Sequence, residues 1–335
     1  MTRFIRLLDV ENKAEAMAEA VTAVREGYAH PRVFKVNPES FAQVPGSPFA
    51  YWVSDKVLGL FNKFPKFEGE GRTVKIGMKT GDDFRFLRLW WEEDFKNNDF
   101  FCYAKGGTVQ SYYGDLKILV NWKNDGKEVK KFVSQRMKKM FGNEKYEFWI
   151  SNEKYYFNPG ITWSLRGSKF SPRVLPSKSI FSVRGYSALV SQDEEFSSLA
   201  LMNSTPFDYI FKTTLGRFSY PEFIVGTLQK LPWVAPDLDH SQRLAKLARR
   251  AWSTQRQLDT TNETSHAFVL PALLRTQRGD WNPAALKAEL RQIQTEIDAI
   301  AFDLYGFSPA DREAVARLNN VAPEAENPEE EEEAA

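Results

Sequence analysis

Cysteine and histidine are scarce in this chain of 335 residues. The single thiol, Cys102, excludes an internal disulfide, and the three histidines show none of the spacing that is typical of a structural zinc site. We therefore expect no disulfide and no metal centre, and we interpret Cys102 as a small core residue.

Long apolar runs are missing as well. No segment approaches about 18 consecutive apolar residues, and no basic and apolar leader opens the chain. We therefore expect a soluble, cytoplasmic protein. The composition is that of a globular chain, with 42% hydrophobic and 14% aromatic residues, and the length allows two or three domains with their own cores.

The motifs of several catalytic classes are also absent. The chain has no Pro-Pro dipeptide, so it lacks the Asn/Asp-Pro-Pro-Tyr loop with which an amino methyltransferase holds a flipped base. The Gly-rich segment 67–71 follows a predicted helix, whereas a cofactor loop follows a buried strand. There is no serine elbow and no P-loop, and segment 115–117 lacks the preceding acidic ligand of a nuclease. We expect no catalytic residue and no cofactor in this chain.

Charge is unevenly distributed, although the net charge is only +1. Residues 117–184 contain 15 Lys and Arg against five Asp and Glu, whereas residues 324–333 contain seven glutamates among Ala, Pro and Asn. The basic stretch favours an anionic partner such as the phosphates of DNA. The acidic stretch cannot form a core, and we expect it to be a disordered tail.

Local patterns predict an α+β fold. The expected elements are a strand at 4–8, a helix at 14–25, a strand at 30–36, a helix from Pro48 to Phe64, strands at 100–104 and 116–122, a basic helix at 128–140, strands at 161–163 and 180–183, helices at 196–202 and 206–213, a strand at 223–233 and two long C-terminal helices. Asp9 or Asn12 caps the first helix, Gly27 ends it, and Ser47 is the expected N-cap of the next. Apolar residues spaced four and three apart between Leu286 and Leu304 favour an antiparallel coiled pair or a docking helix.

The stretch 74–91 reads Val-Lys-Ile-Gly-Met-Lys-Thr-Gly-Asp-Asp-Phe-Arg-Phe-Leu-Arg-Leu-Trp-Trp, and its two apolar, β-prone runs flank a loop. Gly77 and Gly81 can take positive φ, so this loop can approach a phosphate or a base edge closely. A tight connection with solvated charges is the alternative interpretation.

This stretch resembles the Gly-[Leu/Met]-x-Thr-Gly-Asp-Asn segment that opens the target-recognition region of type IIG and PglX-like adenine-specific DNA methyltransferases, with Asp83 where that family usually has Asn. Other words of the family occur in the chain: Pro-Gly-Ser-Pro-x-Ala-Tyr-Trp at 45–52, Gly-Gly-x-x-x-x-Tyr-Tyr-Gly at 106–114, Val-Asn-Trp-x-x-x-Gly at 120–126, Ile-Thr-Trp-Ser at 161–164, Leu-Ala-Leu-Met-Asn-Ser at 199–204, Val-Gly-Thr-Leu-Gln-Lys-Leu-Pro at 225–232 and Leu-Tyr-Gly-Phe at 304–307.

The resemblance implies the C-terminal target-recognition half of a PglX-like (BREX or DISARM type) or type IIG adenine-specific DNA methyltransferase, without the catalytic domain. Its parts would be a β-α-β lead-in at 1–70, a mixed-sheet DNA target-recognition domain at 71–235, a pair of long helices at 236–320 and the acidic tail at 321–335. The implied partners are double-stranded DNA and the catalytic methyltransferase half or other subunits of the defence system. S-adenosylmethionine is expected in the catalytic partner.

The residues that we expect to contact DNA combine cations, aromatic rings and one hydroxyl group. They are Lys79, Thr80, Arg85, Arg88, Lys105, Tyr112, Tyr113, Trp122, Lys123, Arg166, Lys169, Arg173 and Arg184. For the aromatic residues a core position is the alternative, and for the lysines of helix 128–140 it is a solvated face. At the level of the whole chain, the alternatives are a stand-alone DNA-binding or assembly subunit without a methylation role and an enzyme that acts alone.

Overall fold

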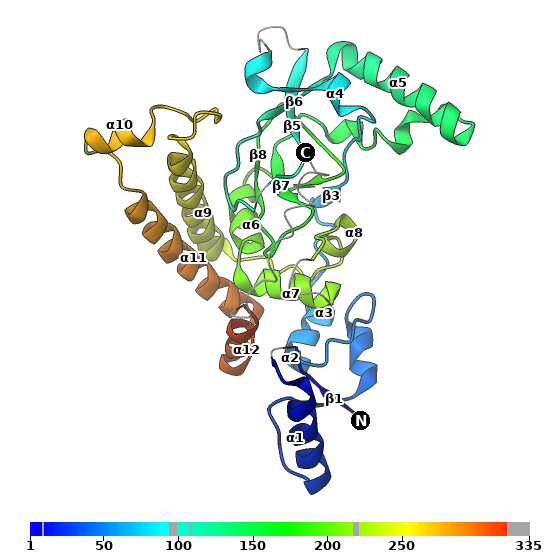
Figure 1. Cartoon of the computed structure of the whole chain (residues 1–335), viewed down its shortest axis with the longest axis vertical. Coiled ribbons are helices and arrows are strands. Elements are labelled where there is room, and N and C mark those ends of the chain that lie inside the picture. The colour runs from blue at the N-terminus through cyan, green and yellow to red at the C-terminus, as the bar shows by residue number, and fades with distance from the viewer. Residues whose placement is uncertain (9, 94–98, 108, 217–220, 320–335) are drawn as a thin grey trace.

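The structure is a computed structural model that describes residues 1–8, 10–93, 99–107, 109–216 and 221–319. Its strands are β1 (Thr2–Ile5), β2 (Val33–Val36), β3 (Thr73–Lys75), β4 (Leu87–Leu89), β5 (Phe100–Ala104), β6 (Ile118–Asn121), β7 (Gly160–Ser164), β8 (Arg173–Leu175), β9 (Ser179–Phe181) and β10 (Gly185–Leu189). Its helices are α1 (Lys13–Glu26), α2 (Asp55–Leu58), α3 (Leu60–Lys63), α4 (Asp83–Phe86), α5 (Lys123–Phe141), α6 (Glu195–Met202), α7 (Thr205–Leu215), α8 (Val225–Leu228), α9 (Leu238–Asp259), α10 (Ala272–Gln277), α11 (Pro283–Tyr305) and α12 (Pro309–Asn319). The predicted α+β class is confirmed (Figure 1).

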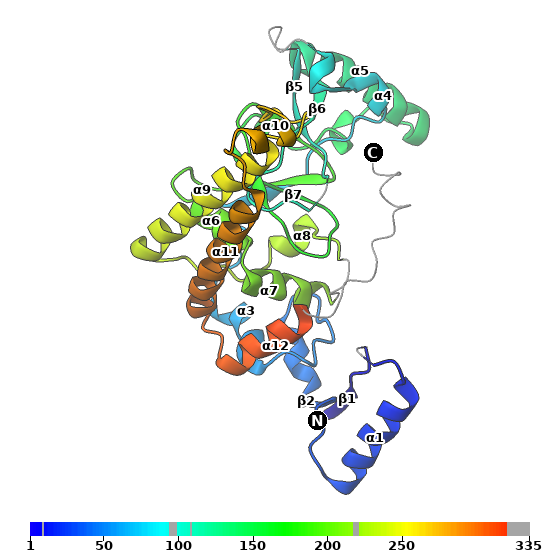
Figure 2. The same ribbon diagram turned by 60° about the vertical axis from the view of Figure 1, so that its left-hand side comes forward.

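The N-terminal unit of β1, α1 and β2 lies at one end of the molecule (Figure 2). Its two strands pair antiparallel. Helix α1 begins where Asn12 Oδ1 accepts the N–H of Glu15, and it ends at Gly27, whose φ of 83° suits glycine. The predicted order of strand, helix and strand is confirmed, although β1 begins before the predicted strand at 4–8. Asp9, the other predicted cap, lies outside the described residues.

The helix predicted from Pro48 to Phe64 is wrong in its first half. Ser47 has a φ of 49°, which places it in a turn with Gly46 instead of in the extended backbone that an N-cap requires. The N-cap is Ser54, whose Oγ accepts the N–H of Val57. The short helices α2 and α3 follow from there.

The first large sheet has the strand order β3-β10-β7-β8, and all its pairs are antiparallel. Every residue of β7 is buried, and the indole N–H of Trp163 donates to the carbonyl oxygen of Phe223 at 2.8 Å. This hydrogen bond satisfies a polar group that burial would otherwise leave without a partner.

The strand predicted at 223–233 is wrong, because α8 forms in this segment instead. Phe223 donates its N–H to Leu165 O in a single bridge, and the chain then turns into α8. The apolar residues that suggested a strand are buried here by long-range packing, which includes the ring of Phe223 against Phe170 and Phe211. Strands β8 and β10, which the sequence did not predict, complete the sheet.

The second large sheet has the order β4-β6-β5-β9 and is mixed, since β5 and β9 run parallel while the other pairs are antiparallel. Helix α5 buries Val129, Val133 and Met137 in the core of this lobe. The basic helix predicted at 128–140 is therefore confirmed. Its regular part begins after Gly126, because residues 124–126 have left-handed backbone angles.

Two neighbouring segments carry the chain between the two large sheets. Strand β9 belongs to the second sheet and β10 to the first, so residues 182–184 cross between them. Residues 76–78 after β3 lie alongside this crossing, because Met78 donates its N–H to Phe181 O and Val183 donates to Met78 O.

The two predicted long C-terminal helices are α9 and α11 (Figure 1). Arg243 pairs with Glu296 and Arg250 with Glu289, so the helices run antiparallel, which is the first of the two predicted alternatives. Gly306 ends α11 with a φ of 75°. One hydrophobic cluster includes buried residues from Val44 to Val315, so the core of the first sheet continues into these helices.

Candidate nucleic-acid interface

A hollow of about 260 Å³ lies where the two large sheets meet. Its lining comes from the loop between β3 and α4, from the end of β5 and from the crossing between β9 and β10. The lining residues are Met78, Lys79, Thr80, Gly81, Asp82, Asp83, Tyr103, Lys105, Ser182, Val183 and Arg184. The structure thus brings together four of the predicted DNA-contacting residues, Lys79, Thr80, Lys105 and Arg184.

Asp83 holds two of these residues in place. One carboxylate oxygen accepts a hydrogen bond from the hydroxyl group of Thr80, and the other forms an ion pair with Lys105 Nζ. Partial burial by itself would raise the pKa of Asp83. The hydrogen bonds from Lys105 and Thr80 and the charges of Lys105 and Arg184 outweigh that effect and keep the pKa below its ordinary value.

The backbone of the loop is fixed by close packing. Gly81 has a φ of 77°, and a Cβ atom there would lie 2.7 Å from the ring of Trp149. Its carbonyl oxygen accepts a hydrogen bond of 2.7 Å from Arg136. Lys79 donates its N–H to Trp149 O and extends its ammonium group over the Trp149 ring, 4.8 Å from the centroid. Arg136 was not among the predicted site residues, although it lies on the predicted basic helix.

Two predicted cations of the same stretch bind protein groups. Arg85 forms two hydrogen bonds, of 3.1 and 2.7 Å, with Glu128 Oε1. Arg88 donates to the carbonyl oxygens of Phe84 and Leu87. Both arginines therefore stabilise α4 in this structure.

Four predicted residues are buried, Thr80 at the hollow and three residues elsewhere, and this corrects their place on the surface. Tyr112 donates its hydroxyl proton to Gln294 of α11, and Trp122 packs against Tyr156 in the second core. Arg173 is 3% exposed and donates to Gly106 O and Ser164 Oγ. Burial lowers the pKa of Arg173 to about 10. Aromatic and basic residues near glycines look alike in sequence whether they face the core or the solvent.

The remaining predicted residues lie outside the hollow; Lys123 and Arg166 are exposed, and Tyr113 and Lys169 are half-buried. Tyr113 packs edge-on against Trp252, and burial raises its pKa to about 12. Lys123 pairs with Asp99, and Arg166 pairs with Glu222. Lys169 is half-buried and has no ion pair within the described ranges.

Helix α5 adds a row of cations that the sequence presented as a possible solvated face. Lys127, Lys131 and Lys139 are exposed and form no ion pair with the residues that the structure describes. Lys130 and Lys138, by contrast, are paired with Glu153 and Glu144. Figure 1 shows α5 and α4 side by side at the same end of the molecule, where α4 follows the loop that lines the hollow.

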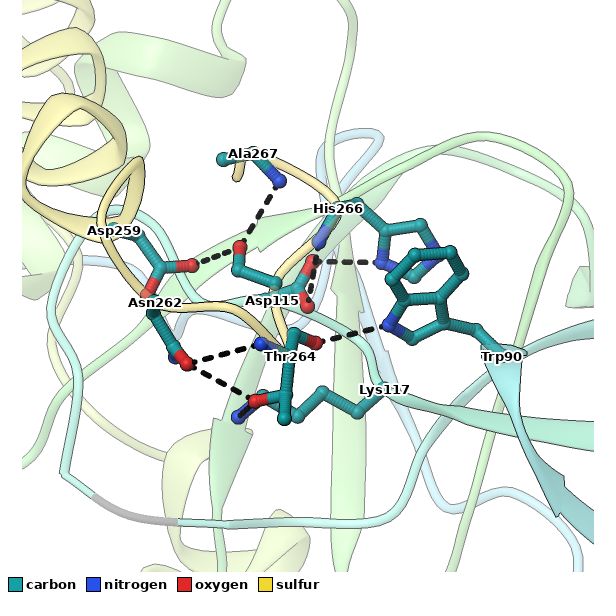
Figure 3. A network of polar contacts seen from close by, with 9 residues as sticks. Trp90, Asp115, Lys117, Asp259, Asn262, Thr264, His266 and Ala267 are labelled. Atoms are coloured by element: carbon teal, nitrogen blue, oxygen red, sulfur yellow. Dashed lines mark hydrogen bonds and ion pairs between the residues drawn. The ribbon is translucent and has the colours of Figure 1, made fainter. Parts of the chain in front are cut away.

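A polar network attaches the C-terminal helical region to the second sheet (Figure 3). The indole of Trp90 donates to Thr264 O at 2.9 Å, and Lys117 donates to Thr264 Oγ1 at 2.8 Å. His266 Nδ1 lies 2.9 Å from Asp115, and its ring stacks on Trp90. The network joins residues 259–267 to the second sheet of the predicted recognition region.

Two further features are absent from the described ranges. No group of three His, Cys, Asp or Glu side chains is placed there to hold a metal ion. None of the helices in these ranges combines the length and apolar character that a membrane crossing requires.

Sequence comparison finds adenine-specific methyltransferases, although no protein-family profile matches the chain. The adenine-specific methyltransferase PglX of Lacticaseibacillus casei (strain Zhang) is 25% identical and covers 88% of this chain, but only 24% of PglX is matched. BrxX of Escherichia coli O9:H4 (strain HS), also an adenine-specific methyltransferase, is 28% identical over 62% of this chain and 16% of BrxX. The chain therefore spans about a quarter or less of these curated relatives.

A solved structure agrees with the fold. The Type IIL restriction-modification enzyme MmeI, in complex with DNA, superposes with a TM-score of 0.51 at 16% identity, over 76% of this chain and 36% of the MmeI chain. The likeness supports a shared fold. The resemblance predicted from the ordered sequence words is confirmed: the chain is similar to one part of the adenine-specific methyltransferases PglX and BrxX.

Proposed function

We propose that this chain recognises duplex DNA as the target-recognition part of an adenine-specific DNA methyltransferase in a phage-defence or restriction-modification system. Methyl transfer, and the S-adenosylmethionine that it needs, belong to a catalytic part or partner. The observation that carries the proposal is the cationic hollow between the two sheets.

The hollow has the chemistry of a phosphate contact. Lys79, Lys105 and Arg184 supply three positive groups against the two carboxylates of Asp82 and Asp83, and Asp83 is already occupied by Lys105 and Thr80. Arg184 is exposed and forms no ion pair with any described residue, so its guanidinium is available for an external anion. Helix α5, whose Arg136 donates to Gly81 O of the loop that lines the hollow, carries further exposed lysines that could bind phosphates.

The relatives agree with this chemistry. PglX and BrxX are adenine-specific methyltransferases, and MmeI is described in complex with DNA. The proposal assigns the DNA-recognising share of such an activity to this chain.

The test is a titration of a labelled duplex by fluorescence anisotropy between roughly 50 and 200 mM salt. The double variant Lys79→Ala/Arg184→Ala should bind more weakly than the natural chain. Its plot of log affinity against log salt should flatten by about one unit for each phosphate that the variant no longer neutralises. The matched control is Lys246→Ala/Lys287→Ala, which removes two exposed lysines from α9 and α11. The proposal would be contradicted if the affinity of the natural chain for the duplex did not change with salt concentration. It would also be contradicted if the two double variants weakened binding equally.

A second candidate function is a stand-alone DNA-binding or assembly subunit. It is favoured by exposed apolar side chains in α10 and just before it, where Leu273 is 70% and Val269 is 68% exposed. Co-purification with the product of the neighbouring upstream gene, followed by a methylation assay, separates the two. A complex that contains both proteins but never methylates DNA would favour the second function.

A further inference from the structure

We infer that Phe84 inserts between neighbouring base pairs of bound DNA and opens the stack beside the cationic hollow. The inference rests on the proposed function and adds a residue that deforms the duplex. Phe84 is 98% exposed, which is more than any other large apolar side chain among the described residues. It directly follows Asp83, which lines the hollow.

Phe84 is presented by a rigid support. Helix α4 has four residues, and the Asp82 carboxylate caps it by accepting the N–H of Arg85 at 3.1 Å. Asp83 is held by Thr80 and Lys105. Phe86, two residues after Phe84, is buried with its ring against Phe132, so the helix is anchored in the second core.

Further hydrogen bonds from Arg85 and Arg88 fix the backbone of α4. Arg85 is bound to Glu128 of α5, and Arg88 donates to the carbonyl oxygen of Phe84 itself at 2.9 Å. The backbone of Phe84 is thus fixed while its ring has almost no protein contact. A ring held ready in this way loses little conformational entropy when it binds.

The charges of the hollow beside Phe84 favour one kind of ligand. A partner that covers Phe84 lies beside the hollow, because Phe84 directly follows Asp83 of its lining, and that lining also contains Lys79 and Arg184. A hydrophobic protein partner offers nothing to these cations, whereas a nucleic acid brings phosphates to them and π-faces to the ring. Apolar side chains that enter a base step unstack it and bend the duplex, and cations on either side bind the backbone. We therefore infer that the ligand at Phe84 is duplex DNA.

The experiment uses duplexes of about 30 base pairs with 2-aminopurine beside a central T·T mismatch, because a mismatch lowers the cost of unstacking. A fully paired duplex with the same label is the comparison. The fluorescence of 2-aminopurine should rise when the natural chain binds. Phe84→Ala should abolish most of this rise and weaken binding to the mismatched duplex by roughly tenfold. Its affinity for the fully paired duplex at low salt should stay within about twofold, because the cations supply that binding.

Two variants complete the test. Phe84→Trp should retain the fluorescence rise, because an indole ring also stacks. Phe49→Ala removes another exposed phenyl group, 72% exposed in the N-terminal part of the chain, and should behave like the natural protein.

Two results would overturn the inference, and only the second would also refute the proposed function. In the first, the natural chain binds duplexes in a salt-dependent way, but Phe84→Ala gives the same rise in 2-aminopurine fluorescence and the same preference for the mismatched over the fully paired duplex. This result refutes only the role of Phe84. If the natural chain binds neither duplex at low salt, the proposed function is refuted as well.

Discussion

At the scale of single residues, Asp83 connects the two sides of the hollow. Its carboxylate binds Thr80 of the same loop and Lys105, which follows β5 of the second sheet. The protonation of one side chain therefore affects the geometry of the candidate interface.

Asp83→Asn should lower Tm at neutral pH by a few degrees, because the amide cannot replace the ionised partner of Lys105. The folded state lowers the pKa of Asp83, so the stabilisation is present above the ordinary Asp value of about 4 and is lost as pH falls through the folded value. The difference in Tm between the natural chain and Asp83→Asn should therefore shrink in acid. Glu263→Gln, at an exposed position, is the control. A difference that stays constant from neutral pH to acid would contradict the ion pair.

Arg173→Glu should prevent folding or lower the free energy of unfolding by about 3–5 kcal/mol, because it buries an uncompensated negative charge. Arg173 has no carboxylate partner within the described residues, and its guanidinium donates to Gly106 O. Lys178→Glu, in an exposed turn, is the matched charge reversal. Denaturant unfolding followed by circular dichroism measures both, and equal stabilities would show that Arg173 is accessible to water.

The residues of the hollow were predictable as a group, but their partners were not. A glycine-containing loop with Lys79 and Thr80 is recognisable in the sequence, and the excess of cations points to Arg184. The ion pair between Asp83 and Lys105 joins residues 22 positions apart, and only the folded chain brings them together. The burial of Tyr112 depends in the same way on α11, far along the chain.

At the scale of elements, long helices were predicted well and short strands poorly. Helices α1, α5, α9 and α11 have repeated apolar spacing and recognisable ends, so local sequence determines them. Strands β3, β4 and β8 have three residues each, which is too short for an alternating pattern, whereas β9, also of three residues, overlaps the strand predicted at 180–183. Their existence depends on pairing with distant strands.

Gly77→Ala should destabilise the protein by about 3 kcal/mol, because the new methyl group would lie 1.8 Å from Phe181 O. The clash is with backbone atoms of Phe181, so the chain segment that crosses between the two sheets would have to shift. Gly226→Ala in α8 is the matched control, since no atom lies within 4 Å of its Cβ position. That change should be neutral or stabilise by about 0.5 kcal/mol. Equal urea midpoints for the two variants would contradict the close approach at Gly77.

At the scale of the whole molecule, two hydrophobic cores support the hollow. One contains the first sheet and the C-terminal helices, and the other contains the second sheet and α5. The α+β class follows from the sequence, whereas the order of the strands does not. Their partners are set by contacts across the chain, such as the bridge from Met78 to Ser182.

The fragment 71–235 should not fold cooperatively by itself, because α9 and α11 supply buried side chains to the core of the first sheet. Leu244, Ala248 and Ile297 belong to the same cluster as Leu199 and Ile210. The fragment should bind a hydrophobic dye and show no sharp thermal transition. Co-expression with residues 236–319 should restore that transition. A fragment that melts as sharply as the full chain would show that the recognition region is an independent domain.

The paired crossings at residues 76–78 and 182–184 have a mechanical consequence. They run next to each other, bound by hydrogen bonds between their backbones, and the second of them ends in Arg184. Because residues 182–184 belong to the connection between both sheets, an anion bound by that guanidinium is held at the junction of the two sheets, and a displacement of Arg184 acts on the backbone hydrogen bonds that link the two crossings.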